Sequence, residues 1–272
     1  MKLLALVWMT LSFSLCAAQS QYIKVNEFAL EYQIAGSGKH IVLLEAGGSS
    51  AMTDWDPVFS QIAEQATVIR YSRVGNGNST QIKRHFTSRD YADYASELLE
   101  KLKISEPVIL VAHSYGGSVA RDFAAAYPAK VKALLLLDPS SEHDVDIIRA
   151  IDLEQGNHEI AQIKLDDMKE GMSNQYLDFW SKRPLPDYPQ INAMPVTVIV
   201  SVKKVENPSN LFFTEQGRKL WGEHWQSWAT AFPQGRAVLT ENSGHFVQFD
   251  EPQLVLQELT RLVGQLDQPQ KI

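Results

Sequence analysis

The chain has 272 residues, of which 44% are hydrophobic and 21% are charged, and its formal net charge is −7. This composition is that of an ordinary globular protein, and the length suits one large α/β domain or a domain with an insertion. The acidic balance, without any run of lysine or arginine, argues against nucleic acid or an anionic membrane surface as a partner.

Residues 1–18 have the pattern of a secretory signal peptide. Lys2 supplies the positive start, residues 3–15 are apolar but too short to span a bilayer, and small residues lead up to Gln19. We therefore predict a secreted or periplasmic protein, cleaved near Ala18 and without a stable membrane anchor. A buried first helix and a lipid anchor on Cys16 are the alternatives. Cys16 is the only cysteine, so cleavage would leave no thiol and no disulfide.

The rest of the chain alternates predicted strands with predicted helices. The first two strands alternate apolar and polar residues, which indicates an antiparallel hairpin, whereas the later strands are apolar throughout. This order predicts an α/β fold, with a mostly parallel, doubly wound sheet. The strands are expected at residues 22–25, 28–34, 41–44, 67–71, 108–113, 131–137, 196–202 and 237–240, and the helices at residues 54–65, 88–103, 118–124 and 251–266.

Residues 140–193 interrupt this rhythm. The interval carries short helical patterns at residues 145–153, 159–172 and 175–180, shows no good strand, and ends in a proline-rich stretch. We interpret it as a helical cap, or lid, inserted into a core formed by residues 19–139 and 194–272. The alternative is a segment that merely packs on the edge of the sheet.

The strand at residues 108–113 runs directly into a serine followed by two glycines and a helical pattern. A turn this tight strains the backbone at Ser114 and exposes its hydroxyl, and it tolerates only small residues two positions away, which are Ala112 and Gly116. The pattern is that of a nucleophile elbow, with alanine in the first position of G-x-S-x-G. Ser114 is therefore the predicted nucleophile.

A serine hydroxyl needs a base, and the base needs a carboxylate that orients it. His245 lies between the last strand and the last helix, so it should face the same edge of the sheet as Ser114. His113 adjoins the nucleophile, but we expect it to pack rather than to react. Asp138 ends the strand after the elbow strand and is the favoured acid. Glu206, the only acid near the end of the next strand, is the alternative.

Acyl transfer also needs hydrogen-bond donors for the oxyanion that develops in the transition state. The backbone N–H of Tyr115, at the start of the helix after Ser114, is one predicted donor. The glycine turn after the strand at residues 41–44 should supply the other, with Gly47 as first choice and Gly48 as the alternative. A phosphate loop is a poor explanation for these glycines, because no Lys-Ser/Thr pair follows them.

Together these motifs resemble those of the α/β-hydrolase superfamily, in the branch of serine esterases and lipases with a helical cap. The resemblance covers about residues 22–266 and depends on residues 45–48 with Trp55, 71–79, 112–117, 137–139 and 243–246, followed by Glu251 and Pro252. It implies hydrolysis through an acyl-serine, without metal or organic cofactor. The chain departs from the usual pattern in three ways: Glu45 and Ala46 replace His-Gly, Ser72 replaces an aspartate, and no aspartate follows the penultimate strand.

The serine nucleophile excludes the haloalkane-dehalogenase and epoxide-hydrolase branches of this superfamily, which resemble the fold but use aspartate. We predict a carboxylic ester as substrate, because this is the commonest chemistry for such a resemblance and because the cap region offers apolar side chains. Amide, lactone and carbon–carbon bond hydrolysis remain open. So does a non-catalytic protein that binds a small apolar ligand, although a pure binder needs neither Ser114 nor His245. The sequence does not indicate an oligomeric state.

Overall fold

The computed structural model describes residues 20–82, 84, 86–170, 191 and 194–268. The predicted signal peptide and the helical pattern at residues 175–180 lie outside the described residues. No helix within the described ranges is long and apolar enough to cross a bilayer.

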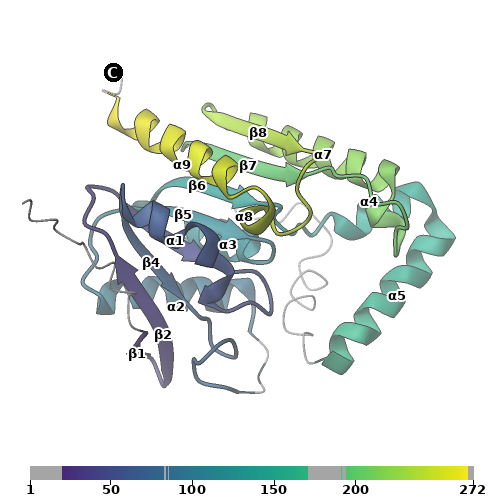
Figure 1. Cartoon of the computed structure of the whole chain (residues 1–272). Coiled ribbons are helices and arrows are strands. Elements are labelled where there is room, and N and C mark those ends of the chain that lie inside the picture. Colours follow the sequence, from purple (N-terminus) through teal and green to yellow (C-terminus); the bar gives the residue numbers. More distant parts are fainter. Residues whose placement is uncertain (1–19, 83, 85, 171–190, 192–193, 269–272) are drawn as a thin grey trace, which may run out of the picture.

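The described part of the chain forms one eight-stranded mixed sheet (Figure 1), with the order β1-β2-β4-β3-β5-β6-β7-β8. β1 pairs with β2 and β2 pairs with β4 in antiparallel fashion, and the remaining neighbours are parallel. The predicted α/β class with a mostly parallel sheet is therefore confirmed. The strands are β1 (Gln21–Val25), β2 (Phe28–Ala35), β3 (Ile41–Glu45), β4 (Thr67–Tyr71), β5 (Val108–His113), β6 (Val131–Leu137), β7 (Val196–Ser201) and β8 (Gly235–Thr240).

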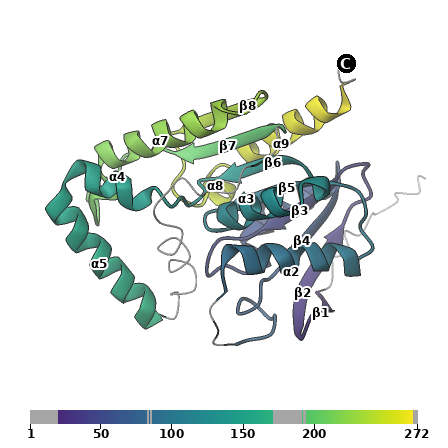
Figure 2. The ribbon, with the colours of Figure 1, turned by 180° about the vertical axis from the view of Figure 1, so that it is seen from behind.

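Helices cover both faces of this sheet (Figures 1 and 2). Because successive side chains of a strand point to opposite faces, Val108 and Leu110 of β5 pack against one layer of helices, and Ile109 and Val111 pack against the other. The first layer contains α2 (Ser88–Lys101), α3 (Gly116–Ala126) and α7 (Glu215–Thr230), and the second contains α1 (Asp56–Ala63) and α9 (Pro252–Asp267).

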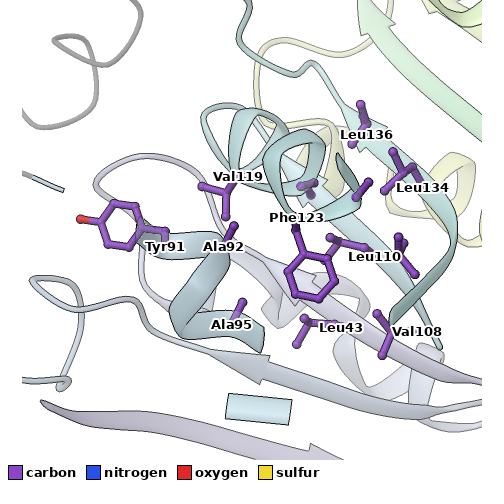
Figure 3. Close-up of a cluster of buried hydrophobic side chains, with 14 of the residues drawn as sticks. Leu43, Tyr91, Ala92, Ala95, Val108, Leu110, Val119, Phe123, Leu134 and Leu136 are labelled. Carbon is purple, nitrogen blue, oxygen red and sulfur yellow. The ribbon is translucent and has the colours of Figure 1, made fainter. Parts of the chain in front are cut away.

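The core beneath α2 and α3 is continuous across the middle of the sheet. Figure 3 shows Phe123 of α3 pointing toward Leu110 of β5 and Leu43 of β3, and all three are buried. Burying a large apolar side chain is worth about 1.5–3 kcal/mol. This packing fixes α3, and therefore the start of α3, against the carboxyl end of β5.

The described part of the predicted cap is helical. α4 (Asp144–Ile151) follows the end of β6, and α5 (Leu153–Glu170) comes directly after it, near α4 and away from the sheet in Figure 1. α5 begins earlier than the sequence pattern indicated because Asp152 accepts the backbone N–H of Gln155 over 2.9 Å, as a helix-capping residue does. The side chains of α5 are described as far as residue 166.

The short elements complete the fold. α2 begins at its predicted residue, Ser88, and Thr87 caps the helix in a reciprocal arrangement with Asp90. The predicted helix at residues 54–65 is divided into a short 3-10 helix and α1. The remaining elements are η1 (Met52–Trp55), η2 (Pro128–Lys130), η3 (Leu211–Phe213) and α8 (Val247–Asp250).

Candidate active site

Ser114 lies in a strained turn between β5 and α3. Its φ angle is +53°, in the left-handed region that residues other than glycine seldom adopt. The backbone N–H of Ser114 donates to the carbonyl of Leu137 over 3.0 Å, which ties the turn to the end of β6. A Cβ atom on Gly116 would lie 2.5 Å from the carbonyl oxygen of Ala46, so this position admits only glycine. These are the constraints that define a nucleophile elbow.

The structure brings together the three side chains that the sequence singled out. The Nε2 atom of His245 lies 2.9 Å from the Oγ of Ser114, and its Nδ1 atom lies 2.7 Å from Oδ2 of Asp138. The imidazole is partly exposed, whereas the carboxylate is buried. A proton can therefore pass from the serine hydroxyl to an imidazole whose other nitrogen faces a carboxylate.

Asp138 follows β6, and its other oxygen is held by three donors from the next elements. Oδ1 accepts the backbone N–H of Ser201 over 3.0 Å, the guanidinium of Arg218 over 3.2 Å and the indole N–H of Trp221 over 3.1 Å. Burial raises the pKa of Asp138, but the hydrogen bond from His245 and the charge of Arg218 outweigh it and hold that pKa below its ordinary value. The carboxylate is thus ionised and fixed.

Glu206, the alternative acid, is not part of this arrangement. It is exposed in the loop after β7. The end of β7 instead contributes Ser201, whose N–H contacts Asp138 and whose hydroxyl donates to the carbonyl of Ser243 over 2.7 Å. One residue therefore positions both the carboxylate and the loop that carries His245.

A buried arginine, Arg73, holds the loop after β3 through hydrogen bonds to its backbone carbonyls. Arg73 donates to the carbonyl of Ala46 and to that of Gly48, each over 2.7 Å, and also to the carbonyl of Gly47. Glu45 forms an ion pair with Arg73, and both side chains are almost fully buried. Glu45, which stands where the family pattern usually has histidine, therefore helps to pack the loop after β3 through its ion pair with Arg73.

The two predicted oxyanion donors differ in their surroundings. Tyr115 directly follows Ser114 and has helical backbone angles at the N-cap of α3, which directs N–H groups toward the site. The N–H of Gly47, however, donates to Oδ2 of Asp54 over 2.9 Å. This hydrogen bond is at odds with the prediction that Gly47 donates to the oxyanion, because an N–H group that already donates to a buried carboxylate is a poor donor to substrate. Gly48, the alternative, is half-buried one position further along.

A cavity of about 330 Å³ opens beside Ser114 and His245. Its walls come from α4, α5, η3 and α7, so the described part of the predicted cap does line the site. Most of the wall is apolar, and the apolar side chains are those of Val145, Ile148, Ile160, Ile163, Phe212, Phe213 and Trp221.

The ionisable residues in the cavity wall have partners within the protein. Glu142 forms a buried ion pair with Arg121 over 3.1 Å, and Arg218 pairs with Asp138. Burial raises the pKa of Asp144 well above its ordinary value, and its carboxyl group accepts the backbone N–H of Ser141 over 3.2 Å. The described wall therefore favours an uncharged, apolar group over an ionic one.

Sequence reasoning missed three features of the site. Arg218 and Trp221 were not predicted as site residues, and His113 was expected only to pack. Trp221 is buried, contacts Asp138 and lines the cavity. The positions of Arg218 and Trp221 in the sequence do not predict their contacts with Asp138, because α7 lies beside the end of β6 only in the folded chain.

Comparison with known proteins gives a family and a fold. A family model described as "alpha/beta hydrolase fold" matches residues 39–176. An uncharacterized protein from Mycobacterium tuberculosis is 33% identical over 53% of this chain and 42% of its own length. A soluble epoxide hydrolase from a Corynebacterium species is 35% identical over 42% of this chain and 39% of its own length. The chain thus matches less than half the length of these relatives.

A solved structure extends the likeness to almost the whole chain. An esterase from Thermogutta terrifontis superposes with a TM-score of 0.64 at 20% identity, covering 92% of this chain and 100% of that one. At this identity the likeness establishes the fold alone.

Proposed function

Since the chain belongs to the α/β-hydrolase fold family, we propose that it is an exported serine hydrolase that cleaves a carboxylic ester. Ser114 is the nucleophile, His245 the general base and acid, and Asp138 the residue that orients the imidazole. The single observation that supports this most strongly is the hydrogen-bonded line from Ser114 through His245 to Asp138, at 2.9 and 2.7 Å.

In the proposed reaction, Ser114 attacks the ester carbonyl while His245 takes the hydroxyl proton. The tetrahedral oxyanion accepts hydrogen bonds from the N–H groups of Tyr115 and Gly48. His245 then gives the proton to the departing alcohol, which leaves an acyl-serine. A water molecule activated by His245 hydrolyses this intermediate and restores Ser114.

The cavity beside Ser114 supports an apolar acyl group as part of the substrate. Its apolar wall, and ionisable groups that already have partners within the protein, match an uncharged chain. Epoxide hydrolysis, the activity in the name of one relative, is not proposed for this chain, because the elbow presents a serine and not an aspartate. Export is supported by the sequence of residues 1–18 alone, and N-terminal sequencing of the exported protein should begin near Gln19.

Hydrolysis of p-nitrophenyl acetate and butyrate, together with labelling by a fluorophosphonate, tests the proposal. The probe should modify Ser114, as mass spectrometry of the peptide would show, and Ser114→Ala should lower kcat by about 10⁴-fold or more. Absence of both p-nitrophenol release and labelling would end the enzyme interpretation. Labelling without ester turnover would direct the search to a panel of amides and β-diketones.

A further inference from the structure

A second histidine–aspartate pair lies directly behind the proposed catalytic residues. The Nδ1 atom of His113 is 2.8 Å from Oδ2 of Asp54, and both side chains are buried, with exposed fractions of 1% and 2%. The Nε2 atom of His113 lies 3.0 Å from the backbone carbonyl oxygen of His245. The proposed reaction uses neither His113 nor Asp54.

The partners of this pair define where its protons are. A carbonyl oxygen only accepts, so Nε2 of His113 carries a hydrogen. Asp54 accepts the N–H of Gly47 over 2.9 Å and the amide N–H of Gln248 over 3.0 Å. Burial raises the pKa of Asp54, but its hydrogen bonds and the charge of His113 outweigh it and leave that pKa below its ordinary value. The carboxylate is therefore ionised, and Nδ1 of His113 donates to it.

This pair connects the three segments that carry the proposed chemistry. His113 is the last residue of β5 and immediately precedes Ser114. Through Asp54 it reaches the N–H of Gly47 in the loop after β3, and through Nε2 it reaches the backbone of His245. A Cβ atom on Gly47 would lie 2.9 Å from Nδ1 of His113, so the glycine loop packs directly on this ring.

We propose that His113 and Asp54 form a buried ion pair that positions the site, holding the backbone of His245 and the loop at Gly47 in place beside Ser114. The inference depends on the proposed serine hydrolase function. His113 and Asp54 are positioning residues, since they act through the backbone of Gly47 and His245 and not on the reacting atoms.

The first test removes one hydrogen bond of the pair at a time. His113→Gln keeps an N–H near the position of Nε2, His113→Asn keeps one near Nδ1, and Asp54→Asn removes the negative charge. Each variant should lower kcat for p-nitrophenyl butyrate by about 10- to 100-fold, because displacements of about 1 Å cost this much, with KM within about twofold. Of the two His113 variants, His113→Gln should retain more activity, because only its side chain can still donate to the His245 carbonyl.

His40→Gln is the matched control. His40 is also buried and lies 3.1 Å from an aspartate, Asp267, but it precedes β3 at the opposite end of the strand from Gly47. This variant should keep kcat within about twofold of the parent protein. Folding of all variants is checked by circular dichroism and thermal melting. Folded His113 and Asp54 variants with unchanged kcat would overturn the proposal.

A second measurement does not depend on the folding of any variant. In protein labelled with ¹⁵N-histidine, each ring nitrogen of His113 should carry a hydrogen, because each faces an acceptor, and the Nε2 hydrogen should be protected from exchange with solvent. An unprotonated nitrogen on His113 would overturn the ion pair. Failure of the proposed function is separate, since it would appear as absent turnover and labelling in the parent protein, whatever the nitrogens of His113 report.

Discussion

Arg218 and His245 contact opposite oxygens of the same carboxylate. The guanidinium of Arg218 lies 3.2 Å from Oδ1 of Asp138, and the imidazole Nδ1 atom lies 2.7 Å from Oδ2. A permanent positive charge therefore competes with the imidazolium that forms during the proposed reaction. We infer that Arg218 keeps Asp138 ionised and at the same time weakens the hold of the His245–Asp138 pair on a proton.

Replacing Arg218 should move the pH dependence of activity. Removing a positive charge beside the His245–Asp138 pair lets the pair bind its proton more tightly, so that pair is protonated, and inactive as a base, up to a higher pH. In Arg218→Met, the acidic limb of the kcat/KM profile should therefore move upward by about one pH unit, which corresponds to about 1.4 kcal/mol. The measurement is a pH–rate profile with p-nitrophenyl acetate.

Trp221→Phe is the matched control for this effect. The indole donates to the same oxygen of Asp138 over 3.1 Å, but it carries no charge. The ionisable groups that face the pair from the neighbouring elements, among them His113 and Asp144, are unchanged in both variants. Equal shifts in the two variants would mean that loss of a hydrogen bond, and not of a charge, governs the profile.

The acid that the site uses can be identified by a pair of amide substitutions. Asp138→Asn keeps the shape of the side chain but cannot stabilise an imidazolium, so kcat should fall by about 10⁴-fold. Glu206→Gln should leave kcat within about twofold, because Glu206 is exposed in the loop after β7. A larger loss in Glu206→Gln than in Asp138→Asn would transfer the acid role to Glu206.

The sheet and the location of the site follow from patterns that are local in the sequence. Uninterrupted apolar strands predicted a parallel sheet, and the strand before Ser114 together with the glycines after it predicted the elbow. Asp138 was favoured because it ends a strand at the correct edge of the sheet. Each of these predictions needs only neighbouring residues and the rule that parallel strands end at one edge.

Contacts between distant segments could not be predicted in this way. Asp54 lies 59 residues before His113, and Arg218 lies 80 residues after Asp138. Nothing in the local sequence of either residue marks it as a partner of the site. The hydrogen bond from Gly47 to Asp54 could not be predicted for the same reason. The glycine turn indicates that backbone N–H groups are available near the site, but it does not indicate which of them already donates to another residue.

The cavity should set the preferred length of the acyl chain. Ile163 of α5 lines the cavity, whereas Leu165, on the same helix, is 54% exposed. Ile163→Trp should fill part of the space and lower kcat/KM for p-nitrophenyl octanoate by about 10-fold or more, since burying each methylene is worth about 0.8 kcal/mol. Acetate should be hydrolysed within about threefold of the parent rate. Leu165→Trp is the control, and an equal loss for both esters in Ile163→Trp would contradict an acyl pocket.

The ion pair between Glu45 and Arg73 should matter for stability as well as for the shape of the loop. Both side chains are almost fully buried, and Arg73 also donates to the carbonyls of residues 46–48. Glu45→Ala would leave a buried guanidinium without its counter-charge, and losing one partner of a buried pair costs about 3–5 kcal/mol. We expect the free energy of unfolding, measured by urea denaturation, to fall by that amount.

An exposed ion pair supplies the comparison. Glu223 lies 3.0 Å from Lys219 on the surface of α7, and both side chains are more than half exposed. Glu223→Ala should change the free energy of unfolding by less than about 1 kcal/mol, because water already solvates both charges. Comparable losses in Glu45→Ala and Glu223→Ala would mean that water reaches Arg73 once Glu45 is removed, and that the loop at residues 46–48 is held by its own backbone contacts.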